Sequence, residues 1–341
     1  MNTNHKSVRR LLGIVCQALL IIFILGFLFW QAAGNPEFYK MLGRDKRWGF
    51  LFLAVVCNLS SVMITFLRWR WLVRVLDIPF SYREMLRISS IGYLFNLAPA
   101  GIVSGDLIKI FLLARRYQGV NERITASVLI DRVIGLYVMF LVSCTAIFVT
   151  GFYNRPETIA RVSTQIVLTL TIIASVCILL AMLPGVSGST IRNSLKRIPY
   201  CGHFLAKMLE AFNVYRSHLL TLLVSMIVTF PVHILQSWCI WSVARGFFDN
   251  VTAAGAIDHI VMHTIANLTS MIPLAVGPYE AVLNNLYPLY LGDAAIGIGL
   301  VTALGYRLCC IVVAGIGIGF YLTNRREVAA VRDDLEKPDV E

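Results

Sequence analysis

The chain has 341 residues, of which 57% are hydrophobic and only 14% are charged. Its mean hydropathy of +0.73 lies far above that of soluble domains, so the composition excludes a water-soluble protein and indicates an integral membrane protein. The formal net charge of +11 does not indicate nucleic-acid binding, because Lys and Arg gather at the ends of apolar runs, as membrane topology requires. The eight cysteines have no CxxC spacing and mostly lie inside apolar runs, which predicts reduced, buried thiols.

Apolar runs of about 18 or more residues predict transmembrane helices. The first run follows Lys6, Arg9 and Arg10 as in a signal peptide, but it is too long for the apolar part of one, so we expect it to be retained. Six full spans are predicted, at 11–33, 48–67, 124–150, 162–184, 218–244 and 294–322. The whole chain, 1–341, is therefore predicted to be one all-α, polytopic membrane domain with a short polar tail at 323–341.

Two further apolar segments are interrupted in the same way, at 88–115 and 254–290. Pro99 lies seven residues before Asp106, Pro273 lies seven residues before Glu280, and glycine lies between the two in each case. Backbone freed by such a break cannot face lipid, so breaks persist only where they are buried in protein or line a wet cavity. The pattern predicts two broken helices that mark a functional site. The alternative is that both are ordinary helix-turn-helix packing units with incidental prolines.

The distribution of Lys and Arg predicts the orientation. With a cytoplasmic N-terminus, most of them fall on the cytoplasmic side, in the loops at 68–87, 116–123 and 185–217 and in the tail. Because basic residues flank 88–115 at both ends, that segment should enter and return as a re-entrant hairpin, whereas 254–290 should begin and end outside. The two hairpins would then enter from opposite faces, related by inverted pseudo-symmetry. We expect a multi-pass protein of the cell inner (plasma) membrane with both termini in the cytoplasm.

Four charged residues, two just after the first break and two in the span that follows, are candidates for the site. Asp106 is predicted to lie in the first turn of a helix that begins near Ser104, where it is either a carboxylate stabilised by the helix dipole or a cation partner at a wet site. Lys109 lies three residues on, on the same face, and can pair with it. Asp131 and Arg132 are adjacent and cannot face each other on a helix, so each needs a partner elsewhere, unless Arg132 reaches the cytoplasmic interface. The structural alternative is a clamp between helices.

Two further charges lie deep in apolar sequence. Glu280 follows Pro278 and has no Lys or Arg nearby in the sequence, so it is a candidate functional carboxylate. Arg307 lies near the middle of the last span, where an arginine costs roughly 2.5–3.5 kcal/mol on insertion scales. It needs a carboxylate, for which Glu280 and Asp131 are candidates, or a bound anion such as a lipid phosphate.

A polar stripe precedes the second break, because His259, His263 and Asn267 recur every four residues. The HxxxH spacing resembles part of a zinc site, but the zincin glutamate is missing between the two histidines. We therefore expect a wet polar groove and no metal. The tryptophans Trp69 and Trp71 fall at a span end and are typical of an interfacial aromatic belt.

Several of these motifs occur in a fixed order, at Arg68–Trp71, Leu97–Pro99, Ser104–Asp106, Ala126–Leu136 and Ile272–Glu280. Over about 45 to 320, this ordered set resembles the lysylphosphatidylglycerol synthase/flippase transmembrane-domain family. Bifunctional members of that family aminoacylate phosphatidylglycerol in a C-terminal cytosolic domain and translocate the product through the membrane domain. This sequence shows no such soluble domain, so the resemblance implies flippase-like lipid handling and argues against lipid aminoacylation. Ser104, Ala275 and Val276 replace glycines that the family often has at its two breaks.

The sequence therefore predicts a lipid-translocating membrane protein whose two hairpins line a headgroup pocket. The candidate substrate-binding residues are Asp106, Lys109, Asp131, Arg132, Glu280, Arg307, His259, His263 and Asn267. One alternative is a non-transporting accessory protein that binds lipid-linked intermediates or a partner enzyme. An integral membrane transferase is disfavoured, because no acid–base pair or donor-binding motif is found; no catalytic residue and no cofactor is predicted. The expected partners are membrane lipids, with a second copy of the chain or a partner synthase as open options.

Overall fold

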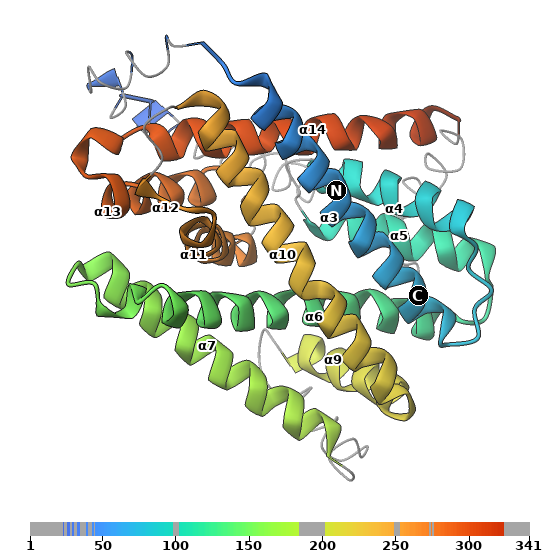
Figure 1. Ribbon diagram of the computed structural model, residues 1–341. Coiled ribbons are helices and arrows are strands. Elements are labelled where there is room, and N and C mark those ends of the chain that lie inside the picture. Colours follow the sequence, from blue (N-terminus) through green and yellow to red (C-terminus); the bar gives the residue numbers. More distant parts are fainter. Residues whose placement is uncertain are drawn as a thin grey trace, which may run out of the picture.

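The computed structural model describes residues 45–97, 102–183, 202–248 and 253–323, except Pro273 and Ala275, together with isolated positions before residue 45. The predicted first span at 11–33 and the tail lie largely outside these residues, as do Pro99 and Pro273 of the two breaks. Helices and turns make up the described part of the chain, which contains no strand. The all-α architecture predicted from the sequence is thus confirmed (Figure 1).

Five long apolar helices can cross a membrane, and they confirm five of the six predicted spans. They are α3 (Trp48–Arg74), α6 (Asn121–Val149), α7 (Thr158–Met182), α10 (Leu219–Phe247) and α14 (Ile298–Thr323). With 25 to 29 residues each, they are about 37–44 Å long, enough for a hydrocarbon core about 30 Å thick. The short segments beside them are η1 (Phe152–Asn154), α9 (Gly202–Tyr215) and η2 (Arg216–His218).

The first predicted break lies in a hairpin of two short helices, α4 (Tyr82–Asn96) and α5 (Ile102–Arg116), which pack against each other. Each has 15 residues and is about 22 Å long, too short to cross the hydrocarbon core. The two outer ends of the hairpin lie together. Glu84 caps α4 by accepting the Ser81 N–H at 3.0 Å, and it also pairs with Arg116 at the end of α5. The Tyr117 hydroxyl donates to the Pro79 carbonyl at 2.9 Å.

The second predicted break lies in a similar arrangement of short helices. They are α11 (Ala256–Asn267), η4 (Leu268–Met271), α12 (Pro278–Leu286), α13 (Pro288–Leu291) and η5 (Asp293–Ala295). The chain turns into α12 at Gly277, whose φ of 113° favours glycine, and Pro278 supplies the first helical residue. With 12 and 9 residues, α11 and α12 cannot span a bilayer either.

Both hairpins pack against α14, at opposite ends of it (Figure 1). Near the start of α14, Gly299 lies against the backbone of Asn284 in α12, and near its end Gly317 lies against the Ser90 carbonyl of α4. The two contacts are about 27 Å apart along the helix. This arrangement fits hairpins that enter from opposite faces, with Arg307 between them.

The hairpin topology predicts which residues share a side of the membrane. In a cysteine-free variant, Arg83→Cys at the start of α4 and Arg115→Cys at the end of α5 should both react with an impermeant maleimide added from the cytoplasmic side. Ile257→Cys, exposed at the start of α11, should react from the outside. Labelling of positions 83 and 115 from opposite sides would mean that 88–115 crosses the membrane completely.

The close contact between α4 and α14 predicts a stability effect. A Cβ atom at Gly317 would lie 2.4 Å from the Ser90 carbonyl oxygen and 3.1 Å from the Leu94 Cβ. Gly317→Ala should therefore lower the free energy of unfolding by about 1–3 kcal/mol through overpacking. Gly315→Ala, two residues earlier on the same helix, meets nothing within 4 Å and is the matched control. Equal thermal stability of the two purified variants would contradict this packing.

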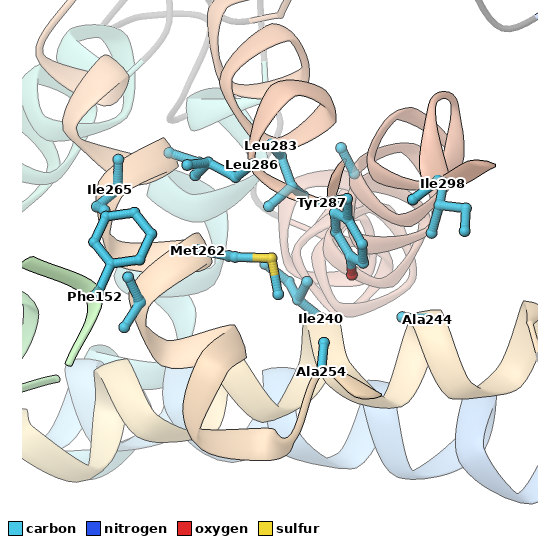
Figure 2. Packing of buried hydrophobic residues seen from close by; sticks show 14 of the residues in the cluster. Phe152, Ile240, Ala244, Ala254, Met262, Ile265, Leu283, Leu286, Tyr287 and Ile298 are labelled. Carbon is cyan, nitrogen blue, oxygen red and sulfur yellow. The ribbon is translucent and has the colours of Figure 1, made fainter. Parts of the chain in front are cut away.

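The largest buried core lies where α10, α11, α12 and α14 meet. Figure 2 shows Met262, Leu283, Leu286, Tyr287 and Ile298 gathered there. On the other side of α6, α7 exposes a row of apolar side chains, which suits a lipid-facing helix.

Candidate functional site

A buried ion pair joins three long helices. Arg68 of α3 donates from Nε to an Asp131 carboxylate oxygen of α6 at 2.8 Å, and from one terminal nitrogen to the Asp131 carbonyl at 3.1 Å. Its other terminal nitrogen donates to the Thr229 hydroxyl of α10 at 2.7 Å. The side chains of Arg68 and Asp131 are 4% and 8% exposed. The guanidinium is thus held by bonds to two neighbouring helices, as a buried charge requires.

The neighbouring residue on α6, Arg132, faces the first hairpin instead. Its guanidinium makes two parallel bonds of 2.6 Å to the two carboxylate oxygens of Asp106 on α5. The expectation that Asp106 lies in a first helical turn is wrong, because α5 begins at Ile102 and has no acidic residue in its first turn. The carboxylate is held by an arginine from another helix. The prediction that Asp131 and Arg132 find partners in different directions is confirmed.

Lys109 brings a third positive charge to this region. Its ammonium lies 4.0 Å from the Asp106 carboxylate, as the spacing predicts, and 5.3 Å from the centre of the Trp69 ring. Its side chain is only 8% exposed. The charges that act on it are those of Asp106, Arg132, Asp131 and Arg68.

These five residues form what we call the basic cluster: Arg68, Lys109 and Arg132 with Asp106 and Asp131. Three basic side chains meet two carboxylates, so the cluster has one positive charge in excess when all five groups are ionised. Most of the cluster is buried, but the Arg132 side chain is 36% exposed. Arg132 is therefore the most exposed side chain of the cluster.

Glu280 and Arg307 form a second ion pair, at the second hairpin. Arg307 Nε donates to one Glu280 carboxylate oxygen at 2.6 Å, and the other oxygen accepts the Gly277 N–H at 2.6 Å. The expectation that no cation neutralises Glu280 is wrong, because α12 packs against α14 and brings the two side chains together. The alternative prediction, that Arg307 pairs with Glu280, is confirmed. The Glu280 side chain is fully buried, whereas that of Arg307 is 29% exposed.

The two histidines of the polar stripe on α11 are buried among protein groups, and Asn267 is half-buried. His259 bonds through Nδ1 to the Gly255 carbonyl at 2.7 Å and through Nε2 to the Tyr287 hydroxyl at 3.0 Å. His263 Nδ1 lies 3.0 Å from the Tyr279 hydroxyl, and Asn267 Nδ2 lies 3.3 Å from a methionine sulfur. The two histidine rings are fully buried, so they do not line the open groove expected from the sequence. Tyr287 lies inside the apolar core shown in Figure 2.

Four residues of this polar interior were not predicted from the sequence. Arg68 was assigned to a cytoplasmic loop and Trp69 to an interfacial belt, but α3 continues to Arg74 and buries both side chains. Arg68 could have been found by extending the predicted span at 48–67 by two helical turns, to the observed end of α3 at Arg74. Thr229 and His233 on α10 carried no signal beyond being polar residues within a long span.

An apolar cavity of about 280 Å³ lies on another face of α6. Side chains of α6, α7, α9 and α10 line it, among them Ile134, Tyr137, Ile178, Phe212 and Leu222. Apart from the Tyr137 hydroxyl, which bonds to Ser175 at 3.0 Å, the lining residues offer no polar side-chain group. Helix α6 thus separates the basic cluster from a space suited to hydrocarbon.

Comparison with known proteins adds one family and one weak relative. A family model described as the lysylphosphatidylglycerol synthase TM region matches residues 14–317. UPF0104 membrane protein PH1989 of Pyrococcus horikoshii is 27% identical over 128 residues, which are 37% of this chain and 36% of that protein. The match thus spans about a third of that relative's length. No solved structure matches the chain.

Proposed function

Because this chain belongs to the lysylphosphatidylglycerol synthase transmembrane-region family, we propose that it moves phospholipids between the two leaflets of the membrane. The family is a membrane domain of the synthase/flippase type, and the chain is a multi-pass membrane protein. Translocation, the headgroup site and the orientation with both termini in the cytoplasm are parts of the proposal.

The observation that carries the proposal is the excess positive charge of the basic cluster. A charge buried away from water is costly unless an opposite charge accompanies it. The two carboxylates balance two of the three basic side chains, so one phosphate group would complete the balance. Guanidinium groups bind phosphate through two parallel hydrogen bonds, the geometry in which Arg132 now holds Asp106.

This geometry suggests how a headgroup enters. The phosphate would take over the guanidinium of Arg132, the most exposed side chain of the cluster, and Asp106 would shift to the Lys109 ammonium, which already lies 4.0 Å away. No charge is left unpaired during such an exchange of partners. When the lipid leaves, Asp106 would pair with Arg132 again, as it does in this structure.

The apolar cavity supports a lipid substrate independently. The surrounding membrane supplies acyl chains in excess. Helix α7, which contributes to the cavity wall, also exposes apolar side chains on its surface. We assign the cavity of about 280 Å³ to part of one acyl chain of the bound phospholipid. The headgroup and the chain would then lie on two sides of α6.

The test is translocation of fluorescent phospholipids in proteoliposomes, measured by dithionite quenching. Arg132→Gln should lower the rate by at least about tenfold, since it removes a charge-assisted bidentate contact. Arg116→Gln is the matched control, because Arg116 on α5 also pairs with a carboxylate from another helix, Glu84 of α4, but its side chain is 55% exposed. An exposed pair contributes about 0–1 kcal/mol, so this variant should behave like the unchanged protein.

Two results would reject the proposal. Equal rates in Arg132→Gln and the unchanged protein would remove the headgroup site. Lipid binding without any translocation by the unchanged protein would favour the accessory role that the sequence left open.

A further inference from the structure

Arg70, near the end of α3, is a buried arginine without a counter-charge. It is 5% exposed, and its Nε is enclosed and has no hydrogen-bond partner. Within the described residues Arg70 forms no ion pair and donates no hydrogen bond. A buried charge is costly unless an opposite charge or hydrogen bonds accompany it, so this guanidinium needs an explanation.

An aromatic ring fixes the orientation of this guanidinium. Its central carbon lies 3.6 Å from the centre of the Tyr82 ring of α4, a distance typical of stacking on the face of the ring. The N–H donors of a guanidinium lie in its own plane, so stacking leaves them free for an acceptor at the edge. Tyr82 is 56% exposed, and an exposed side chain changes rotamer rapidly, which gives a ligand access to the arginine beneath it.

Arg70 faces a different side of α3 from the basic cluster. Residues two apart on a helix point in directions about 200° apart. Arg68 bonds to α6 and α10, whereas Arg70 contacts α4. The missing counter-charge of Arg70 therefore belongs to a second site.

The charges around Arg70 favour an anion from outside the protein. The acidic residue at the start of α4, Glu84, already accepts the Ser81 N–H at 3.0 Å and pairs with Arg116. Two further arginines lie close in the sequence and are exposed, Arg74 one turn further on α3 and Arg83 at the start of α4. A cluster of arginines at the end of a membrane helix attracts anionic headgroups.

The depth of Arg70 and its apolar surroundings suit a phospholipid. Arg70 lies four residues, or about 6 Å, before the end of α3, where headgroups meet the hydrocarbon. A shallow apolar hollow lies between α3, α4 and α14, with Phe66, Tyr93 and Ile316 among its lining residues (Figure 1). Phe66 precedes Arg70 by one helical turn, so the two lie on the same face of α3. A soluble phosphate would use only the arginine, whereas a phospholipid would use the hollow as well.

We propose that Arg70 and Tyr82 form a second phosphate-binding site, which holds the headgroup of an anionic phospholipid. The edge of the guanidinium donates two parallel hydrogen bonds to the phosphate, and Tyr82 covers its face. One acyl chain of the same lipid lies in the hollow. The phosphate supplies the negative charge that Arg70 lacks, and the site goes beyond the proposed function because its lipid lies on another side of α3 from the basic cluster.

Two pairs of variants isolate this site. Arg70→Gln removes the guanidinium, and Arg74→Gln, on the exposed side of the same helix, is its matched control. Tyr82→Leu removes the aromatic face, and Tyr82→Phe keeps it. In detergent without lipid, Arg70→Gln should melt no lower than Arg74→Gln, because Arg70 has no partner to lose. A clearly lower melting temperature would reveal a partner within the protein and overturn the site.

The measurement is binding of phosphatidylglycerol to the full chain by native mass spectrometry. It is made in the Arg132→Gln background, so that the proposed headgroup site does not contribute. This protein should still bind phosphatidylglycerol, and added Arg70→Gln should weaken the binding by at least about tenfold, whereas added Arg74→Gln should not. Tyr82→Leu should weaken it about two- to fivefold, as expected for an exposed cation–π contact, and Tyr82→Phe should not. Equal binding with and without Arg70→Gln overturns the proposal.

Competing ligands identify the source of the phosphate. Phosphatidylcholine carries its own cation and should bind more weakly than phosphatidylglycerol, and inorganic phosphate should not displace the bound lipid. Equal binding of the two lipids overturns the assignment to an anionic lipid. Binding of inorganic phosphate that depends on Arg70, without binding of phosphatidylglycerol, overturns the assignment to a lipid. Binding that depends on Arg70 in a protein that shows no lipid flux rejects the proposed function and leaves this site standing.

Discussion

Arg68→Leu should lower the free energy of unfolding by about 3–5 kcal/mol, because it leaves the buried Asp131 carboxylate without its charged partner. The Thr229 hydroxyl loses a bond as well. The loss should be visible as a large decrease in the melting temperature of the purified protein in detergent. Arg74→Leu, at the exposed end of the same helix, is the control and should lie within about 0.5 kcal/mol of the unchanged protein.

The double variant separates charge from packing. Arg68→Leu with Asp131→Leu removes both members of the pair, so no buried charge remains unmatched, and most of the stability should return. A double variant as unstable as Arg68→Leu alone would mean that the loss comes from the shape of the arginine, and the ion-pair explanation would fail.

Arg307→Leu should also be destabilising by about 3–5 kcal/mol, although leucine suits the middle of a membrane helix better than arginine. The reason is Glu280, whose carboxylate is fully buried and would keep only the Gly277 N–H as a partner. The reverse change should be milder. In Glu280→Gln the amide oxygen can still accept that N–H, and Arg307, whose side chain is 29% exposed, can reach other polar groups.

The decisive test of this pair is whether a second substitution restores the stability that Arg307→Leu removes. Glu280→Gln added to Arg307→Leu should recover stability, since it removes the unpaired charge. Leu308→Ala, next to Arg307 but facing outward with 59% exposure, should change the melting temperature much less than Arg307→Leu does. If Arg307→Leu is fully stable and only lipid flux is lost, the arginine serves the ligand and the structural role of the pair is refuted.

The apolar framework could be predicted from the sequence because hydrophobic length and helix breaks are local properties. Runs of apolar residues identified five helices that the structure confirms, and the Pro–Gly interruptions identified both hairpins. The carboxylates Asp106 and Glu280 were predicted for the same reason, since each follows a break.

The partners of the charged residues could not be predicted in the same way, because they are separated by long stretches of chain. Arg68 lies 63 residues from Asp131 in the sequence, and its proximity to a cluster of other arginines made it resemble a topology signal. Asp106 was expected either to be stabilised by the dipole of its own helix or to pair with a cation at a wet site, and the arginine that holds it lies 26 residues away. The depth of a charged side chain depends on which helices come together, and that information is absent from hydropathy.

The position of α14 has a mechanical consequence. One helix touches both hairpins, through Gly317 at one end and Gly299 at the other. If α14 tilts about a point near Arg307, its two ends move in opposite directions, so separation from α4 on one face brings approach to α12 on the other. The two membrane faces would then open in alternation, and a single rigid lever would prevent them from opening together.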